Sequence, residues 1–138
     1  MAKLRHLALH SENPEAAAEF YKRAFGMREI SRKTDSPLAS INIYLTDGTI
    51  HLAILKYRTA ELARVYGGSD AYGISHFGFW VEDVEQTRNR LREAGSEYIE
   101  RRAAGQNVLF EEKWKGPDGV VFDITDKGWT GAKPPGAE

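Results

Sequence analysis

The chain has 138 residues, of which 41% are hydrophobic and 11% aromatic, enough apolar side chain for one compact unit. Its 19 Lys and Arg residues nearly balance 20 Asp and Glu residues, which argues against a basic nucleic-acid surface or an acidic tail. The absence of cysteine excludes thiol nucleophiles, thiolate metal sites and disulfides.

The first residues carry no export or membrane signal. Met1 leads directly into the first predicted strand, with no apolar leader and no run of about 18 apolar residues. We therefore expect a cytoplasmic protein without a membrane or nucleic-acid partner.

The first half of the chain predicts a strand, a helix and three further strands. Residues 4–10 alternate as a strand, and Asn13 with Pro14 begins a helix that ends at Gly26. Strands are predicted over residues 27–32, 40–45 and 49–55, the last two joined by a turn at Asp47-Gly48. This module covers residues 1–56.

The second half predicts the same order of elements. A connector over residues 57–72, with a short helical stretch at 59–66, leads to a module over residues 73–126. Its elements are a strand over 74–81, a helix from Asp83 to Gly95, and strands over 97–101, 108–114 and 120–125. Residues 127–138 are rich in Gly and Pro without periodicity, so we expect a loosely held C-terminal tail.

Two βαβββ modules predict an α+β fold. Each helix covers one face of the sheet, and the other face must curve to enclose an interior space. On that other face, four strands each place one side chain that can bind a metal: His6, His51, His76 and Asp123. Three imidazoles and one carboxylate suit a divalent first-row transition metal and are too rich in nitrogen for calcium or magnesium.

Each of these residues also has an ordinary structural interpretation. A single strand histidine is more often a hydrogen-bonded core residue than a ligand, and no local HExxH or CxxC spacing is present. The coincidence of the four positions is what favours a metal site. His10 is predicted to be a solvated residue at the rim. The residues expected to contact substrate, or to be simple packing residues, are Asn42, Tyr44, Trp80 and Trp114.

Several motifs resemble those of the vicinal oxygen chelate superfamily over residues 3 to about 126. These motifs are Arg5-His6-Leu7-Ala8-Leu9, Glu19-Phe20-Tyr21, Phe25-Gly26-Met27, Ile50-His51-Leu52, Ser75-His76-Phe77 and Pro117-Asp118-Gly119-Val120-Val121-Phe122-Asp123. The superfamily includes glyoxalase I, methylmalonyl-CoA epimerase, extradiol dioxygenases, fosfomycin-resistance transferases and bleomycin-resistance proteins. The resemblance implies paired βαβββ modules that form a cupped, barrel-like mixed sheet with the helices outside.

The resemblance also implies one divalent transition metal (Ni, Zn, Co, Mn or Fe) bound by His6, His76, Asp123 and His51. Two positions depart from the usual pattern. The slot of Asp123 is usually glutamate, which is longer by one methylene. The slot of His51 is glutamate in glyoxalase I and glutamine in the epimerases, so His51 points away from a simple glyoxalase I.

The leading hypothesis is a glyoxalase-like lyase or isomerase that chelates a small oxygenated substrate and stabilises an enediolate, with His51 or Asp123 leaving the metal to act as the base. One alternative is an extradiol-type iron dioxygenase in which His6, His76 and Asp123 form a 2-His-1-carboxylate triad. Another is a non-enzymatic, bleomycin-resistance-like binding protein. A homodimer is implied by resemblance alone, and the loops at residues 34–39 and 103–107 carry no pattern that identifies the substrate.

Overall fold

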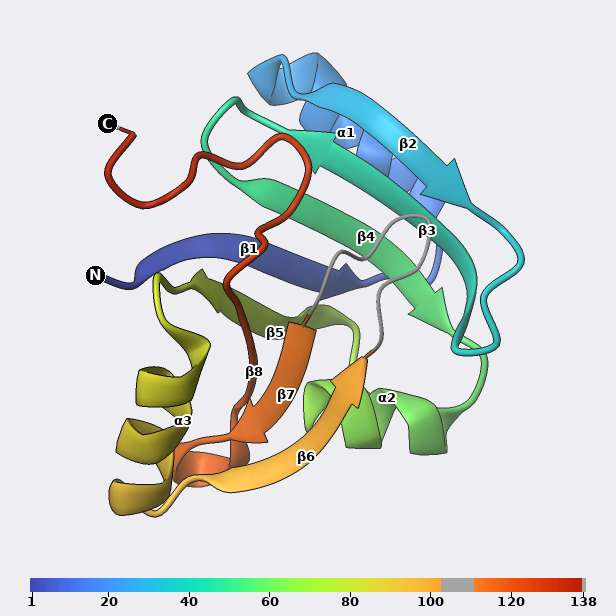
Figure 1. The fold of residues 1–138 in the computed structure, drawn as a ribbon. Helices are drawn as coiled ribbons and strands as arrows, with labels where there is room; N and C mark the ends of the chain where they lie inside the picture. Colours follow the sequence, from blue (N-terminus) through green and yellow to red (C-terminus); the bar gives the residue numbers. More distant parts are fainter. Residues whose placement is uncertain (103–110, 138) are drawn as a thin grey trace.

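The computed structural model describes residues 1–102 and 111–137, which form two βαβββ halves joined by a short helix (Figure 1). The first half contains β1 (Lys3–His10), α1 (Pro14–Phe25), β2 (Arg28–Lys33), β3 (Ala39–Thr46) and β4 (His51–Tyr57). The connector contains α2 (Ala60–Gly67). The second half contains β5 (Gly73–Trp80), α3 (Val84–Glu93), β6 (Glu97–Arg102), β7 (Glu111–Lys115), a 3-10 turn (Pro117–Gly119) and β8 (Val121–Thr125).

The helices lie where the sequence predicts them, within two residues at each end. The side chain of Asn13 accepts a hydrogen bond from the backbone N of Ala16 (3.1 Å), and Gly26 ends α1 in the left-handed conformation at φ 68°. Asp83 accepts from the backbone N of Gln86 (3.0 Å) at the start of α3. In the described part of the chain, no helix is both long and apolar enough to cross a lipid bilayer.

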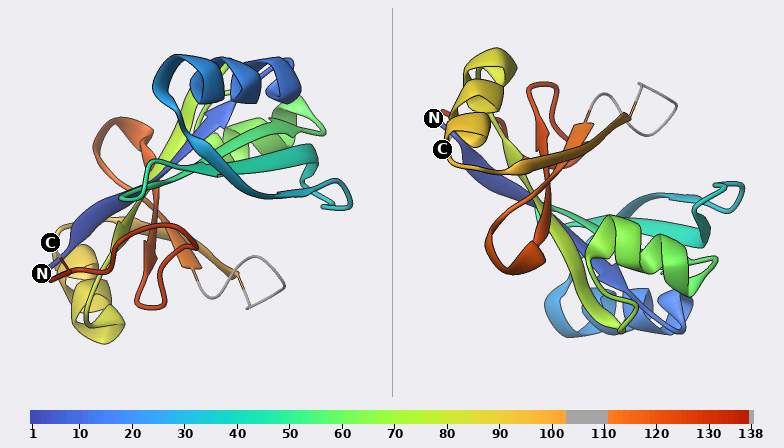
Figure 2. Two further views of the ribbon diagram at one scale, coloured as in Figure 1. Left: turned by 90° about the horizontal axis from the view of Figure 1, so that it is seen from above. Right: turned by 90° about the horizontal axis from the view of Figure 1, so that it is seen from below.

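All eight strands form one mixed sheet in the order β2-β3-β4-β1-β5-β8-β7-β6. The two halves meet where β1 and β5 pair antiparallel, with Leu7 opposite Phe77. On either side of this junction β1 is parallel to β4, and β5 is parallel to β8. The sheet curves strongly without closing, and α1 and α3 lie outside it (Figure 2). The predicted α+β class with a cupped mixed sheet is confirmed.

The alternation of each strand separates a packed outer face from a hollow inner face. In the first half, the outer face packs beneath α1 through a cluster that includes Ala18, Ile43, Leu45 and Ile54. Ile43 and Ile54 are fully buried. The inner face carries smaller residues such as Ala8, which leaves space inside the cup.

Some predicted boundaries shift for a local reason. The strand predicted to start at residue 49 starts at His51, because Asp47 Oδ1 accepts hydrogen bonds from the backbone N atoms of Thr49 (2.8 Å) and Ile50 (2.9 Å) and extends the turn. The strand predicted over residues 108–114 is observed from Glu111, and residues 108–110 and the loop at 103–107 lie outside the described residues.

The C-terminal segment differs from the expected loose tail. After β8 the chain runs back over the sheet toward β1 and β4 (Figure 1). Trp129 is only 8% exposed, the backbone O of Gly131 accepts from Thr46 Oγ1 (2.9 Å), and the backbone O of Lys133 accepts from Arg5 Nε (2.8 Å). These contacts depend on one buried indole and on backbone groups, which have no periodic signal in the sequence.

Candidate metal centre

The four predicted metal-binding side chains lie close together on the inner face, on four strands. His6 of β1 is in register with His51 of β4, and Gly78 of β5 is opposite both His6 and Asp123 of β8. His76 precedes Gly78 by one strand period and points to the same face. All four side chains are buried, with exposed fractions between 0% and 6%.

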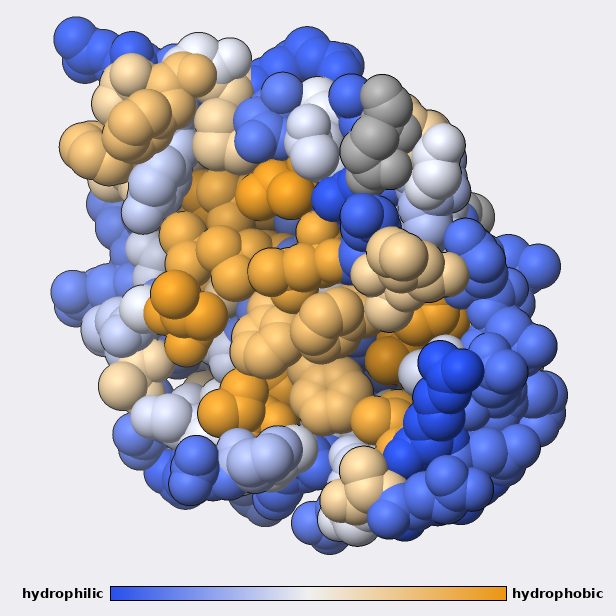
Figure 3. Space-filling view, turned by 90° about the vertical axis from the view of Figure 1, so that its left-hand side faces the viewer, coloured by the Kyte–Doolittle hydropathy of each residue, from blue (hydrophilic) through white to orange (hydrophobic). Residues whose placement is uncertain are grey.

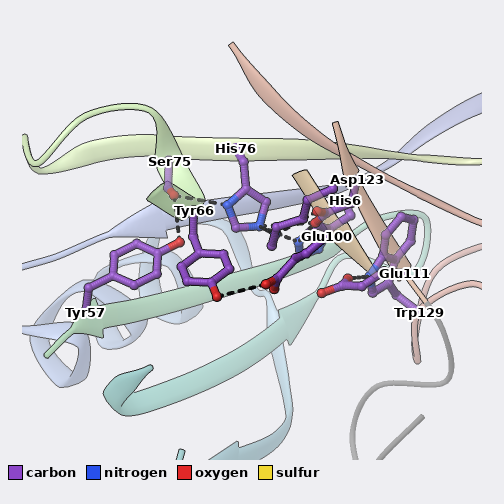
Figure 4. Close-up of polar contacts among 10 residues, drawn as sticks. His6, Tyr57, Tyr66, Ser75, His76, Glu100, Glu111, Asp123 and Trp129 are labelled. Atoms are coloured by element: carbon purple, nitrogen blue, oxygen red, sulfur yellow. Dashed lines mark hydrogen bonds and ion pairs between the residues drawn. The ribbon is translucent and has the colours of Figure 1, made fainter. Parts of the chain in front are cut away.

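Three of the four side chains converge on one point. His6 Nε2 lies 3.4 Å from His76 Nε2 and 3.6 Å from Asp123 Oδ2, and His76 Nε2 lies 3.2 Å from Asp123 Oδ2. Figure 4 shows the three groups directed toward one another. Among the described residues, these three form the cluster of His and carboxylate groups that could surround a metal ion.

The donor set fits a divalent transition metal. Asp123 Oδ2 is fully buried and accepts no well-formed hydrogen bond from any described residue, so its lone pairs lack a partner. Ligands bonded to Zn²⁺ at about 2.0–2.1 Å in a tetrahedron are about 3.3 Å apart. The observed separations of 3.2 to 3.6 Å are close to that spacing.

Lys113 of β7 completes this cluster and was not predicted from the sequence. Its Nζ lies 2.7 Å from Asp123 Oδ1 and 3.5 Å from His76 Nε2, and its side chain is only 3% exposed. Burial alone would raise the pKa of Asp123, but the ammonium of Lys113 and the imidazole of His76 hold it well below the usual range. The pKa of Lys113, which burial alone would lower, is raised by Asp123 and by Glu111. One carboxylate oxygen is thus bound to Lys113, and the other faces the imidazoles.

Burial favours the neutral form of two of the histidines, His6 and His51. Burial lowers the pKa of His6 well below its ordinary value, and the neighbouring rings of His51 and His76 lower it further. Burial also lowers the pKa of His51. Neutral rings have one unprotonated nitrogen, which is the form that binds a metal or accepts a proton.

His51 is adjacent to this cluster but is not one of the three converging groups. Its ring centroid is 5.2 Å from that of His6, and its Nδ1 lies 3.0 Å from the backbone O of Thr130. Because a carbonyl oxygen only accepts, Nδ1 must carry the proton, and Nε2 is then the unprotonated nitrogen of the neutral ring. Nε2 is therefore available to bind a metal or to accept a proton.

His76 is oriented by two further side chains. Ser75 Oγ lies 3.0 Å from His76 Nδ1 and 3.0 Å from the hydroxyl of Tyr57 (Figure 4). The glycine at position 67, at the end of α2, leaves room for this serine, because a Cβ there would collide with Ser75 Oγ. A hydrogen bond to the second ring nitrogen fixes the orientation of an imidazole ligand.

A cavity on the inner face opens beside the cluster. It is lined by His6, Asn42, Tyr44, His51, Tyr57, Tyr66, His76, Glu111, Lys113 and Trp129, among other residues. Asn42 and Tyr44, for which the sequence predicts substrate contacts, are among the lining residues. In the described residues, Glu111 is the only carboxylate in the lining, and burial raises the pKa of its side chain.

Trp80, Trp114 and His10 lie elsewhere in the molecule. Trp114 is on the opposite face of β7, where its Nε1 donates to Glu112 Oε1 (3.1 Å), and Trp80 packs against Gly128. Neither lines this cavity among the described residues. His10 was predicted to be solvated, but it is only 7% exposed because Tyr57 and Tyr72 pack against its ring.

The glyoxalase family model, described as Glyoxalase/Bleomycin resistance protein/Dioxygenase superfamily, matches residues 3–124. The chain belongs to this superfamily. The match covers both βαβββ halves and includes His6, His51, His76 and Asp123, so the resemblance that the motifs indicate is confirmed.

Within the glyoxalase superfamily, the chain is similar to epimerases. It is 30% identical over 118 residues to an ethylmalonyl-CoA/methylmalonyl-CoA epimerase of Cereibacter sphaeroides, an alignment that covers 80% of this chain and 87% of that enzyme. A methylmalonyl-CoA epimerase structure in complex with methylmalonyl-CoA and NH4+ superposes with a TM-score of 0.75 at 16% identity, covering 98% of this chain and 99% of that one. A Streptomyces coelicolor methylmalonyl-CoA epimerase variant has a TM-score of 0.71 at 16% identity, covering 88% and 94% of the two chains. These structures support the fold.

Proposed function

We propose that the protein is a divalent-metal-dependent isomerase of the glyoxalase superfamily that moves a proton at a carbon next to a carbonyl. The observation that carries this proposal is the convergence of His6 Nε2, His76 Nε2 and Asp123 Oδ2 within 3.6 Å of one another beside a cavity. A metal bound by these residues would act as a Lewis acid on two neighbouring substrate oxygens and so acidify the adjacent C–H.

Each of these ligands has a second partner. Lys113 donates to Oδ1 of Asp123, the carboxylate oxygen that does not face the imidazoles. Ser75 Oγ hydrogen-bonds Nδ1 of His76, and the indole of Trp129 stacks on the ring of His6 with centroids 4.8 Å apart. Such partners keep the donor atoms directed to one point and reduce the motion that binding a metal would have to freeze.

We assign proton transfer to His51 and Glu111. His51 presents an unprotonated Nε2 when neutral, since its Nδ1 donates to the backbone O of Thr130. Glu111 is the carboxylate in the described lining of the cavity, and it comes from the opposite half of the molecule. An epimerisation needs a base on one face of the carbon and an acid on the other, which two groups from different halves can supply.

Asp123 is a poorer base than the sequence suggested. Its Oδ1 accepts from Lys113, its side chain has no exposed surface, and its pKa is lowered by Lys113 and the imidazoles although burial opposes this. A carboxylate with a lowered pKa binds protons weakly. We therefore assign Asp123 to metal binding and leave proton transfer to the other two groups.

The names of the relatives support a proposal for the substrate class. The enzymes that resemble this chain are named for methylmalonyl-CoA and ethylmalonyl-CoA, so we propose a malonyl-type acyl-CoA thioester with an acidic C–H between two carbonyl groups. Within such a substrate, the thioester and carboxylate oxygens are placed to chelate one metal ion.

The test combines metal analysis with hydrogen exchange. Untagged protein purified without chelator should retain a divalent transition metal, and His76→Ala should not, whereas His10→Gln, on β1 outside the cluster, should retain it. With methylmalonyl-CoA in D₂O, NMR should show enzyme-dependent loss of the α-proton signal. The metal assignment fails if added Zn²⁺ or Co²⁺ binds His76→Ala as tightly as wild type. The base assignment fails for His51 if His51→Gln keeps both metal and full exchange.

The alternative with a specific observation in its favour is an extradiol-type dioxygenase. The convergent set contains two imidazoles and one carboxylate, with His51 outside it, which is the ligand set of many non-haem iron(II) oxygenases. Protein loaded with Fe²⁺ that consumes oxygen with a catechol, and does not exchange the α-proton of methylmalonyl-CoA, would favour this alternative over the isomerase.

A homodimer is our proposal for the oligomeric state. Figure 3 shows hydrophobic side chains gathered over a broad area of one face of the molecule. Exposed aromatic residues also lie on and near α1, where Phe20 is 58% and Phe25 is 71% exposed. Light scattering coupled to size-exclusion chromatography should give twice the chain mass, and a monomer at about 50 μM would refute the proposal.

A further inference from the structure

We propose that the C-terminal segment Gly128–Gly131 is part of the metal centre, with Trp129 as its positioning residue. This inference rests on the metal site of the proposed function but not on the identity of the reaction. The segment lies beyond the residues that match the superfamily model, which end at residue 124. Three groups of the candidate site touch it, and each comes from a different strand.

The first group is the imidazole of His6. The indole of Trp129 stacks on this ring, with centroids 4.8 Å apart and the two planes 14° from parallel. His6 Nδ1 is buried and has no hydrogen-bond partner among the described residues. An imidazole ligand is normally oriented by a hydrogen bond at its second nitrogen. For His6 the stacked indole takes the place of that bond.

The second group is the imidazole of His51. The backbone O of Thr130, the residue after Trp129, lies 3.0 Å from His51 Nδ1. This contact selects the tautomer with the proton on Nδ1 and leaves Nε2 unprotonated. Two consecutive residues of the segment therefore act on the neighbouring histidines of β1 and β4: Trp129 orients the ring of His6, and Thr130 selects the tautomer of His51.

The third group is the carboxylate of Glu111 on β7. Trp129 Nε1 donates to Glu111 Oε2 at 3.2 Å (Figure 4). The indole N–H is an uncharged donor, so it positions this carboxyl without adding a cation to the site. Because Glu111 belongs to the second half and His51 to the first, the segment connects the two proposed proton-transfer groups.

The segment is anchored at both ends, so its geometry is defined. Thr125 Oγ1 accepts from the backbone N of Gly128 (3.2 Å), and the backbone O of Gly131 accepts from Thr46 Oγ1 (2.9 Å). The glycine at position 78 gives the indole its space, since a Cβ there would lie 2.7 Å from the Trp129 ring. A side chain at position 78 would therefore displace Trp129 from His6.

Ordinary core packing is the competing explanation, and Trp114 provides a matched control. Both indoles are buried, and both donate Nε1 to a glutamate of β7, but Trp114 does so to Glu112 on the opposite face. Trp129→Ala should weaken Co²⁺ binding by about 10- to 100-fold and change the visible spectrum of the cobalt protein. Trp129→Phe retains the stacking and should stay within about fivefold of wild type. Trp114→Ala should lower the thermal stability of the metal-free protein but bind Co²⁺ within about twofold of wild type.

The proposal is overturned if Trp129→Ala binds Co²⁺ like wild type with an unchanged spectrum, or if Trp114→Ala weakens binding equally. A second measurement does not depend on the metal. In the metal-free protein, ¹⁵N NMR of the imidazoles should show His51 protonated on Nδ1 in wild type and a mixture of tautomers in Trp129→Ala. If wild type binds no metal, the proposed function fails. The NMR comparison then decides alone whether the segment positions His51. An unchanged tautomer in Trp129→Ala would refute the positioning role of the segment.

Discussion

Replacing Lys113 by methionine tests whether the ammonium maintains the buried carboxylate of Asp123. Methionine keeps most of the apolar stem of lysine but removes the charge. In Lys113→Met, Asp123 would remain fully buried with its Oδ1 no longer bonded at 2.7 Å. The carboxylate must then be buried uncompensated or take up a proton.

The size of the effect follows from the geometry. Two unit charges 2.7 Å apart attract by about 6 kcal/mol at an effective dielectric constant of about 20, and desolvation offsets part of this. Breaking a buried pair by removing one partner typically costs about 3–5 kcal/mol. For a chain of this length, we expect the melting temperature to fall by roughly 10–20 °C.

Differential scanning calorimetry of the metal-free protein measures this loss, and Lys115→Met, two residues along β7, is the matched control. A divalent ion bound by His6, His76 and Asp123 would compensate the same charge, so the loss should be smaller with Zn²⁺ than with EDTA. In the double variant with Asp123→Asn, Lys113→Met should cost at least about 2 kcal/mol less than alone. If Lys113→Met is no less stable than Lys115→Met, the assigned pairing with Asp123 is wrong.

Three further predictions test other parts of the structure. Ser75→Ala removes the hydroxyl 3.0 Å from His76 Nδ1, and titration calorimetry should show Co²⁺ binding weakened about 10- to 100-fold. The control Ser40→Ala, at an exposed serine, should bind Co²⁺ like wild type. Equal affinities of the two variants would contradict the role of Ser75. Hydrogen bonds from Arg32 and Lys22 lower the pKa of Glu29 to about 2 from about 4.5, so its stabilisation is complete above about pH 4.5 and is lost as the pH falls through about 2. Urea unfolding should therefore find Glu29→Gln destabilised by a constant amount from about pH 5 to 7 and progressively less so below, and a difference that does not shrink in acid would refute this. Asn13→Ala should cost about 1 kcal/mol by removing the cap of α1, with no change in Co²⁺ affinity, and an unchanged melting temperature would show that the cap contributes nothing.

The alternation of the strands is why most of the site could be predicted. His51 and Asp123 each have an apolar residue on both sides along the strand, and His6 and His76 each have one, Leu7 and Phe77, so period-two reasoning places the four side chains on the inner face. The pairing of His6 with His51, and of Gly78 with both His6 and Asp123, brings the strands into a common register. Register between strands that are distant in the chain has no local signal, and the resemblance to a known superfamily supplied it.

Lys113 and Glu111 could not be predicted, because the alternation of β7 does not show that both of its faces are buried. The sequence predicts Trp114 of β7 as a substrate contact or a packing residue, and period-two alternation then places Glu111 and Lys113 on the opposite face. In the structure both faces of β7 are covered, and Glu112 on the outer face is buried against Arg88, with a hydrogen bond between Arg88 Nε and Glu112 Oε2 of 2.7 Å. A strand that is buried on both sides through ion pairs has the polarity of an exposed one.

The pairing of Asp123 with Lys113 sets the charge of the site. Asp123 and Lys113 together carry no net charge, and burial lowers the pKa of His6, so this pair would not offset the double positive charge of a divalent ion bound there. A ligand set with an unpaired carboxylate would leave a net charge of only +1. In a buried cavity this difference strengthens the attraction for an anionic substrate, because Coulomb interactions are weakly screened there. For the malonyl-type thioester that we propose as substrate, the pairing would strengthen the attraction for the carboxylate oxygen beside its carbonyl, which a neutral dicarbonyl compound does not offer.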